Sequence, residues 1–392
     1  MRILYAHRTR ARDGSAVHIR SLVEAFRARG HEVLEVSPPI RGGGGTVLER
    51  PGGLRRAARE AAEYAYIPYG AWRLLRAARA FRPDFLYQRY AFADASGILA
   101  AGVTSRPLVL EVNSPLAREL HRTRGLLLPG LGARVERTIL RRASRLAVVS
   151  GVLRDEVEGW GVERSRILLT PNGVDLARFR PDLDGAGIRK RLGLPAEGVL
   201  GFVGYLRPWH RLDLVLEAMA TPGLRGARLL VVGEGPARGA LEERARAAGL
   251  AERVLFTGEV AHAEVPLHVA AFDVALLPAI NPYASPLKIF EYLACAKAVV
   301  APRQRNVEEI VRDEREALLF PPEDPLALAR AIARLLDDPG ARAALGRAGR
   351  ERLLAGRFTW EGNVERVERS LAPLLSGARP QAAGAGGGGG GR

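Results

Sequence analysis

The sequence predicts an α/β protein of two domains, each built on a doubly wound parallel sheet. The first observation is that short β-rich runs alternate with helical stretches, as in a sheet covered by helices on both faces. The second is that this series occurs twice along 392 residues, enough chain for two ordinary domains. The third is a segment rich in Asn-Gly, Pro and Asp between the two series, at residues 171–185, which suits turns.

Two series of β-rich runs carry this prediction. The first consists of RILYA (2–6), EVLEV (32–36), DFLYQ (84–88), PLVLEV (107–112) and RLAVVS (145–150). The second consists of VLGFVG (199–204), ARLLVVGEG (227–235), RVLFTG (253–258), DVALLP (273–278) and AKAVVAP (296–302). Amphipathic segments lie between several of these runs; residues 18–30 form one, which ends at a glycine stop signal.

The chain carries a net charge of +16, and nearly all of its positive charge is arginine because only three residues are lysine. A GC-rich genome and selection for anion binding explain this bias equally well. A nucleic-acid-binding protein is the alternative from another functional class, and it should show clustered basic residues with stacking aromatics. Here arginine is spread along the chain and aromatic residues make up 6% of it, so no nucleic-acid partner is expected.

The sequence favours a cytoplasmic location. The single cysteine, Cys295, excludes an internal disulfide framework. No export signal is visible, and no run approaches the roughly 18 apolar residues of a membrane span. Residues 54–81 are Arg-rich and partly amphipathic. An exposed helical region is favoured there, and the alternative is a helix that holds the protein peripherally at an anionic membrane, at its inner face.

The stretch SPLKIFEYLA (285–294) predicts a helix that begins with an unusual lysine. Ser285 suits the N-cap and Pro286 the first helical position, which places Lys288 at the third. The helix dipole disfavours a cation there by roughly 0.3–1 kcal/mol. An anion such as a diphosphate at the helix start would explain the lysine. Glu291, one turn later, would then accept hydrogen bonds from a ribose, although a Lys–Glu ion pair in the weaker order is the alternative.

Two glycine-containing turns lie in the same half of the chain. FVGYLRPWHRLDLVLEAMA (202–220) places Gly204 at a strand end and a group of cations directly after it, which suits an anionic ligand. A solvated arginine loop is the alternative. VVGEGPARGALEERARAAG (231–249) is similar to a dinucleotide fingerprint, but it follows the second strand of its domain, where a tight turn explains the glycines equally well.

The order and spacing of several motifs resemble glycosyltransferase family 4, whose members have the GT-B fold. The motifs are DGSAVHIRSLVEAFRARGHEV (13–33), PDFLYQRY (83–90), LVLEVNSPLA (108–117), LLTPNGVDLARFRP (168–181), FVGYLRPWH (202–210), VGEGP (232–236), FTGEVAHAEVP (256–266), SPLKIFEYLACAKAVVA (285–301) and LLFPPEDPLALARAIARLLDD (318–338). The resemblance runs through nearly the whole chain up to the glycine-rich end.

The resemblance implies two Rossmann-like domains that face each other across a cleft. Residues 1–172 would bind the acceptor and residues 186–357 the donor, with a linker at 173–185. Residues 358–376 would form a helix that returns to the first domain. Within the first of these domains, GGGG (42–45) is expected to be a flexible loop, and residues 377–392, after the last helix, are expected to be a disordered tail.

By the same resemblance, the protein transfers a sugar from a nucleoside-diphosphate sugar to a glycan, lipid or small-molecule acceptor. The anomeric configuration would be retained, and no metal or other cofactor would be needed. Glu291 would bind the ribose, and Glu259 and Val260 the nucleobase. Gly14, Ser15, Gly204, Arg207, His210, Ser285, Leu287 and Lys288 would surround the diphosphate. Arg207, Lys288 and Asn113 are the residues expected to act in catalysis.

The chemistry of this transfer requires stabilisation of charge on the leaving diphosphate. Fixed cations and helix N–H groups provide it without reorganisation. Retention without an evident carboxylate nucleophile implies attack by the acceptor on the face that the diphosphate leaves. A sugar-nucleotide epimerase of the same fold is the nearest enzymatic alternative. Asp182-Leu183-Asp184 is a D-x-D sequence, but its place in the linker favours a structural role over a metal site.

This chain departs from the family pattern at three places. Tyr205 and His210 stand where members often carry Arg and Lys, so Arg207 is expected to supply the missing charge. Tyr283 replaces the first acid of the paired-glutamate motif, which removes the usual contact to the donor sugar. Asn113 stands where many members have a cleft histidine. His18 and His121 are the other candidate histidines, and a lone histidine is more often structural.

Overall fold

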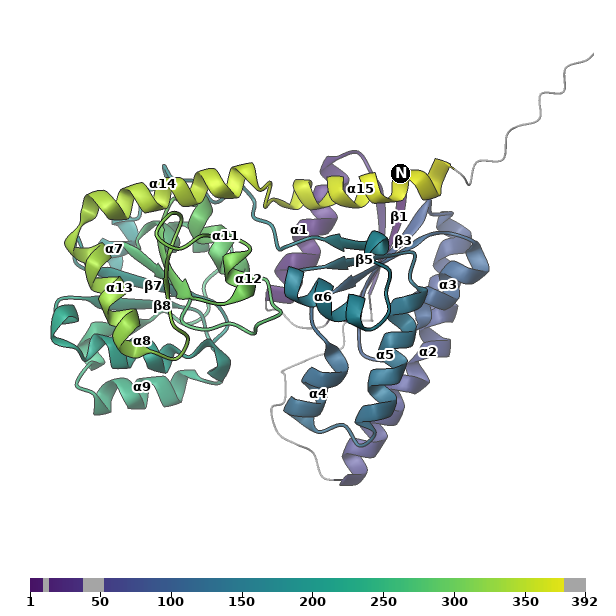
Figure 1. The fold of residues 1–392 in the computed structure, drawn as a ribbon, viewed down its shortest axis with the longest axis horizontal. Coiled ribbons are helices and arrows are strands. Elements are labelled where there is room, and N and C mark those ends of the chain that lie inside the picture. Colours follow the sequence, from purple (N-terminus) through teal and green to yellow (C-terminus); the bar gives the residue numbers. More distant parts are fainter. Residues whose placement is uncertain (10–13, 38–52, 377–392) are drawn as a thin grey trace, which may run out of the picture.

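The computed structural model describes residues 1–9, 14–37 and 53–376; the loop expected at 42–45 and the tail expected at 377–392 lie outside them. The described chain forms two six-stranded parallel sheets with helices around them. Figure 1 shows the two domains next to each other, joined along one side by the C-terminal helices. The predicted fold class, α/β with two doubly wound sheets, is confirmed.

The N-terminal sheet has the strand order β2-β1-β3-β4-β5-β6. Its strands are β1 (Arg2–Ala6), β2 (Glu32–Val36), β3 (Phe85–Arg89), β4 (Leu108–Val112), β5 (Arg145–Val148) and β6 (Ile167–Leu169). The helices of this domain are α1 (Gly14–Ala28), α2 (Gly53–Phe81), α3 (Ser96–Thr104), α4 (Leu116–Arg124), α5 (Pro129–Arg142) and α6 (Gly151–Gly159), with a 3-10 turn at Arg164–Arg166. The amphipathic segment predicted at 18–30 overlaps α1 from residue 18 to the end of the helix at Ala28.

The C-terminal sheet has the strand order β12-β11-β10-β7-β8-β9. Its strands are β7 (Val199–Val203), β8 (Arg228–Val232), β9 (Val254–Phe256), β10 (Val274–Leu276), β11 (Ala298–Pro302) and β12 (Leu318–Phe320). The helices are α7 (Ala186–Leu192), α8 (Leu212–Met219), α9 (Arg238–Ala247), α10 (Val265–Ala270), α11 (Leu287–Ala294), α12 (Arg305–Glu308), α13 (Pro325–Asp337) and α14 (Pro339–Ala355), with 3-10 turns at Pro208–His210, Pro222–Leu224 and Ala251–Arg253. The strand order reverses between β7 and β10, and such a switch point opens a crevice at the carboxyl ends of the strands.

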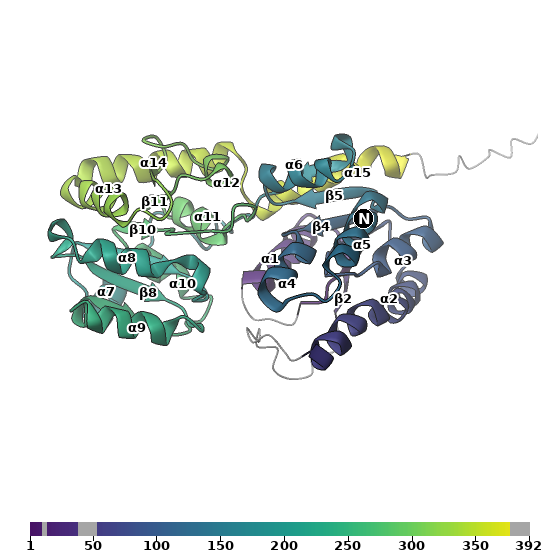
Figure 2. The ribbon, with the colours of Figure 1, turned by 60° about the horizontal axis from the view of Figure 1, so that its bottom comes forward.

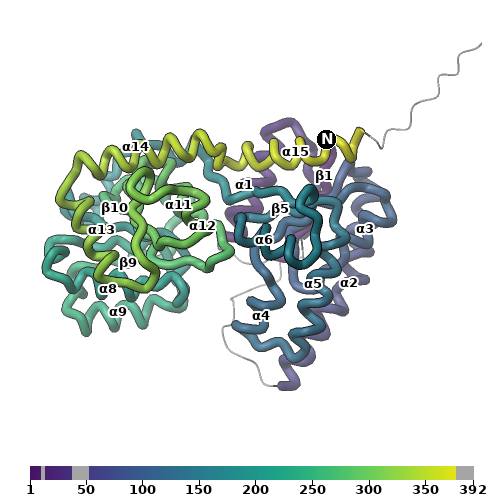
Figure 3. Tube along the Cα trace, in the orientation of Figure 1, coloured from purple at the N-terminus to yellow at the C-terminus, as the bar shows by residue number. Residues whose placement is uncertain are grey.

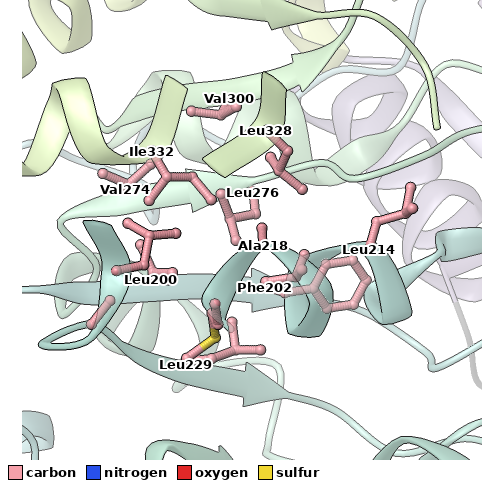
Figure 4. Close-up of a cluster of buried hydrophobic side chains, with 14 of the residues drawn as sticks. Leu200, Phe202, Leu214, Ala218, Leu229, Val274, Leu276, Val300, Leu328 and Ile332 are labelled. Carbon is pink, nitrogen blue, oxygen red and sulfur yellow. The ribbon is translucent and has the colours of Figure 1, made fainter. Parts of the chain in front are cut away.

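Both faces of the C-terminal sheet are buried, which explains its uninterrupted apolar runs. On one face, side chains of β7, β8 and β10 pack against α8 and α13 (Figure 4). Figure 4 shows Leu200 and Phe202 of β7 in one buried cluster with Leu214 of α8 and Leu328 of α13. On the other face, Val199 of β7 belongs to a second buried cluster that includes most of α11. This packing holds α11 tightly against the sheet.

The last helix, α15 (Trp360–Ser376), follows α14 and lies on the N-terminal domain, as the trace in Figure 3 shows. Trp360, Val364, Val367 and Leu371 are buried in one cluster with residues of α1, β1 and β3. The C-terminal end of the chain therefore contributes to the core of the first domain. Among the residues that the structure describes, no helix combines the length and apolar content needed to cross a membrane.

Candidate active site

A cleft of about 940 Å³ lies between the two domains. Its N-terminal wall comes from the start of α1, the residue after β4, and α4; its C-terminal wall comes from the loops after β7, β8 and β9 and from the start of α11. In Figures 1 and 2, α11 lies on the side of its domain that faces α1. The residues that the sequence analysis assigned to donor binding and catalysis all line this cleft: Gly14, Ser15, Asn113, Gly204, Arg207, His210, Glu259, Val260, Ser285, Leu287, Lys288 and Glu291.

The α11 helix starts one residue later than the sequence predicted. Pro286 is the N-cap and Leu287 the first helical residue, so Lys288 is the second and not the third. The expected cap, Ser285, uses its hydroxyl to accept a hydrogen bond from the Asn172 backbone N–H instead, at 3.0 Å. No side chain among the described residues caps the helix. Its first N–H groups are thus available to an anion in the cleft.

Lys288 is buried at this helix start, with 8% of its surface exposed. Its ammonium lies 4.4 Å from the centroid of the Phe202 ring, a cation–π contact. Burial lowers the pKa of Lys288 to about 8, and the charge of Glu291 counteracts only part of that shift. Burial thus outweighs the attraction of Glu291, and a further anion in the cleft would favour the charged form of this lysine.

Glu291 lies one turn further along α11 and is also buried. Burial raises the pKa of Glu291 to about 7, although the charges of Lys288 and Arg178 oppose the shift. Burial thus outweighs the two cations at this carboxylate, and hydrogen bonds donated by a ligand would favour its ionised form. The hydroxyl groups of a ribose are donors of this kind.

The loop after β7 places a second cation beside Lys288. Gly204 has φ +146°, and a Cβ atom at this position would lie 3.1 Å from the Lys288 Nζ. The buried guanidinium of Arg207 lies between two aromatic rings, 4.6 Å from the centroid of Tyr205 and 5.2 Å from that of Trp209. The positive φ of Gly204 and its closeness to the Lys288 ammonium explain why a glycine stands where this loop passes the lysine.

His210 does not carry charge in this loop. Burial, together with the positive charges of Lys288 and Arg207, lowers the pKa of His210 to about 2. The imidazole is neutral at physiological pH and offers a hydrogen bond only. Arg207 is thus the cation of this loop that lines the cleft, and its part in place of the missing charge stays a prediction.

The start of α1 approaches the start of α11 across the cleft. A Cβ atom on Gly14 would lie 3.2 Å from Leu287 Cδ1. Gly14 and Ser15 form the first turn of α1. Two helix N-termini, with their partial positive charges, therefore meet at one place in the cleft.

A buried carboxylate that the sequence analysis missed organises the N-terminal wall. Glu111, in β4, accepts hydrogen bonds from Asn113 Nδ2 at 2.6 Å and from the Tyr87 hydroxyl at 3.1 Å, and it pairs with Arg89. Asn113 is thus held in place by Glu111. A charged residue inside the apolar strand LVLEV was the signal available in the sequence, because buried charges need partners.

The structure separates the two candidate histidines. His18 is buried and lines the cleft, whereas His121, in α4, is exposed and does not line it. Further cleft residues that the sequence analysis did not propose lie mainly on the N-terminal wall. They include Arg20, Arg89, Glu119, Thr123, Arg124 and Asn172.

Tyr283, at the position of the missing acid, packs against the N-terminal domain. It is buried in a cluster with residues of β4, β5 and α6, and its backbone carbonyl accepts a hydrogen bond from the Ser150 hydroxyl at 2.7 Å. Tyr283 does not line the cleft. This residue therefore joins the two domains in this structure.

The dinucleotide-like glycines and the D-x-D sequence have structural positions. A Cβ atom on Gly233, at φ +137°, would lie 2.2 Å from the Gly204 carbonyl oxygen, so these glycines let two loops cross closely. Asp184 accepts a hydrogen bond from the Ala186 N–H at 2.8 Å, and Asp182 pairs with Arg180 at 3.5 Å. The described residues hold no group of three or more His, Cys, Asp and Glu side chains arranged for a metal ion.

Comparison with known proteins places each domain in a glycosyltransferase group. Residues 12–178 match the family model described as Glycosyltransferase Family 4, and residues 197–338 match Glycosyl transferases group 1. D-inositol 3-phosphate glycosyltransferase of Acidothermus cellulolyticus is 36% identical over 254 residues, covering 61% of this chain and 56% of that protein. The 2-deoxystreptamine glucosyltransferase of Streptomyces kanamyceticus is 33% identical over 227 residues, covering 55% and 57%. The chain thus spans somewhat more than half the length of these relatives.

Solved structures agree on the fold. Anabaena HepE in complex with UDP matches with a TM-score of 0.76 and 20% identity, covering 95% of this chain and 100% of that chain. The two family matches together span most of the chain, and both six-stranded sheets have the arrangement of the matched structures. The chain belongs to glycosyltransferase family 4 and has the GT-B fold.

Proposed function

We propose that this protein transfers a sugar from a nucleoside-diphosphate sugar to an acceptor hydroxyl, with retention of the anomeric configuration. One observation carries the proposal: the amino end of α11, Lys288 and the Arg207 loop converge in a cleft, one helical turn from the buried carboxylate of Glu291. The first three suit a diphosphate, and the carboxylate suits a ribose. UDP is our candidate for the leaving group, since the matched HepE structure contains it.

The arrangement supports the bond-breaking step. When the bond between sugar and diphosphate breaks, negative charge develops on the leaving oxygen. Lys288, Arg207 and the α11 N–H groups are already in place around the site that we assign to it, so they stabilise that charge without reorganising. The acceptor attacks from the face that the diphosphate leaves, and the diphosphate itself can take the acceptor proton. Neither a metal nor another cofactor has a part in this proposal.

The acceptor would bind on the N-terminal wall. Arg20, Glu119, Thr123 and Arg124 present both charges and a hydroxyl there, which suits a polar molecule with several hydroxyl groups. Two relatives are named as glycosyltransferases of D-inositol 3-phosphate and of an aminocyclitol, 2-deoxystreptamine. We therefore propose a cyclitol as the first class of acceptor to test. Glycan and lipid-borne acceptors are the next classes.

The experiment begins with a thermal-shift panel of UDP-, GDP- and ADP-sugars, because a bound ligand raises the unfolding temperature by mass action. The donor that binds is then incubated with cyclitol acceptors, and the anomer of the product is determined by NMR. A new glycoside of inverted configuration, or trapping of a covalent glycosyl-enzyme, would contradict the retaining mechanism. Loss of turnover in EDTA would contradict metal independence. Conversion of the donor to its epimer without an acceptor would replace this proposal with an epimerase.

Peripheral membrane association and a cytoplasmic location are further proposals. Exposed aromatic and basic side chains on α2, namely Tyr69, Trp72 and Arg76, support the first, because such residues suit an anionic interface. Co-sedimentation with anionic and neutral vesicles tests it, and equal recovery with both kinds would oppose it.

A further inference from the structure

His18 lies at the point where three parts of the molecule meet. It belongs to the second turn of α1 and is 5% exposed. Its Nε2 lies 3.1 Å from a carboxylate oxygen of Glu111 in β4, and its Nδ1 lies 2.7 Å from Oδ1 of Asn172 in the interdomain segment. The Trp360 ring of α15 packs edge-on against it, with the centroids 4.9 Å apart.

The orientation of the Asn172 amide follows from its second contact. Asn172 Nδ2 lies 2.5 Å from the backbone carbonyl oxygen of Ser285. A carbonyl oxygen can only accept a hydrogen bond, so the atom that faces it must be the amide nitrogen. Asn172 therefore presents its oxygen to His18, and the Nδ1 of His18 must be a donor.

The opposite nitrogen of His18 meets an ionised carboxylate. Independently of His18, Glu111 pairs with Arg89 and accepts hydrogen bonds from Asn113 Nδ2 and the Tyr87 hydroxyl, and these donors stabilise the ionised carboxylate. The ionised carboxylate only accepts hydrogen bonds. With acceptors at both ring nitrogens, His18 satisfies the geometry only if both nitrogens carry hydrogen.

We propose that His18 is an imidazolium that acts as a positioning residue. It is the second member of a buried chain of four residues, Glu111–His18–Asn172–Ser285, that sets the first turn of α11 relative to the N-terminal domain. Ser285 is held twice, through its carbonyl oxygen by Asn172 Nδ2 and through its hydroxyl by the Asn172 backbone N–H. Two residues later comes Leu287, the first residue of α11. The charge of His18 does not depend on the proposed function. The expected effect of this chain on nucleotide binding rests on that function.

The charge of His18 is tested by NMR of the imidazole nitrogens in the full chain labelled with ¹⁵N-histidine. The signals of His18 are assigned by their absence in His18→Gln. At about pH 8, where an ordinary histidine is neutral, we expect both nitrogens of His18 to be protonated. In Glu111→Gln the carboxylate charge is gone, and we expect the neutral form with hydrogen on Nδ1 only. A neutral His18 in the wild type would overturn the proposal.

The positioning role is tested with Asn172→Asp. This variant still offers an oxygen to His18, but it places a second oxygen against the Ser285 carbonyl in place of a donor. We expect the backbone amide signals of Leu287 and Lys288 to shift and the affinity for UDP to fall roughly ten- to hundredfold. His18 should remain protonated on both nitrogens.

His31→Gln is the matched control. It removes another histidine–carboxylate contact, 2.6 Å from His31 Nε2 to Glu368 on α15, away from the cleft lining. The α11 amide signals and the UDP affinity should not change in it. Unchanged α11 signals in Asn172→Asp, or equal shifts in both variants, would overturn the positioning role. If the wild type does not bind UDP, the proposed function fails, but the NMR outcomes still decide this inference.

Discussion

The pKa values of buried groups shift in opposite senses on the two walls of the cleft: toward the charged form on the N-terminal wall and toward the neutral form on the C-terminal wall. On the N-terminal wall, Glu111 is surrounded by donors, and its pKa is held well below the usual range despite burial. On the C-terminal wall, burial dominates instead. It lowers the pKa of Lys288 to about 8 and that of His210 to about 2, and it raises that of Glu291 to about 7.

This difference indicates which wall a charged ligand would stabilise. A charged group whose partners are all supplied by the protein is a structural element. A buried group whose pKa shifts toward its neutral form is stabilised only when something else brings the missing charge or hydrogen bonds. The C-terminal wall is thus the side that we expect to bind the charged donor. The N-terminal wall is preorganised.

The largest expected effect comes from removing the carboxylate of the preorganised wall. Glu111→Ala leaves Arg89 and His18 without their buried counter-charge, and we expect it to lower the free energy of unfolding by about 3–5 kcal/mol. Lys288→Met removes a cation whose charged form is disfavoured by burial, so it should leave the stability of the free protein unchanged or higher. Urea unfolding of both variants measures this. Equal losses in the two variants would mean that the walls do not differ.

Lys288 should matter much more for the affinity for the donor than for the stability of the free protein. Lys288→Ala removes one charge-assisted contact to the diphosphate, worth about 1.5–3 kcal/mol, so the affinity for the donor should fall roughly ten- to hundredfold. Lys190→Ala is the matched control, because Lys190 is exposed on α7, away from the cleft lining. Isothermal titration calorimetry measures both. Wild-type affinity in Lys288→Ala would show that the diphosphate site is misplaced.

Within the loop after β7, the charged Arg207 should contribute more to donor binding than the neutral His210. Arg207→Gln should weaken donor binding by about 1.5–3 kcal/mol, because Arg207 supplies charge. His210→Gln exchanges one neutral hydrogen-bonding group for another and should cost about 0.5–1.5 kcal/mol at most. Calorimetry at two salt concentrations separates them, since only the Arg207 contribution should be charge-dependent. A larger effect at His210 would contradict its neutral state.

The smallest effect is on pH dependence. Bound diphosphate favours charged Lys288, so affinity should fall as pH rises above about 8. Ribose hydroxyls favour ionised Glu291, so affinity should also fall as pH drops below about 7. Calorimetry with UDP-glucose from pH 6 to 9 should therefore give a maximum between these values. Glu291→Gln should lose the dependence on the acidic side only, and an unchanged acidic side would remove Glu291 from the nucleotide site.

Residues on the C-terminal wall could be predicted from sequence because local pattern places them there. In a parallel sheet all strand ends meet at one edge, so Gly204 and Glu259 reach the cleft once their strands are recognised. Lys288 was found because a cation at a helix start is locally unfavourable. The helix start itself was wrong by one residue, because Ser285 forms its hydrogen bond with Asn172, which is distant in sequence, and not with its own helix.

The sequence by itself determined the two parallel sheets, five of the six strands in each and the residue types gathered on the donor side, since alternation of apolar runs and helix signals are local properties; the short edge strands β6 and β12 were not predicted. Only the tertiary structure decided which charges are satisfied. The partners of Glu111 come from β3, α1 and the residue after β4, and those of Ser285 come from the interdomain segment. A pKa depends on burial and on neighbours within a few ångströms, which spacing along a chain does not specify.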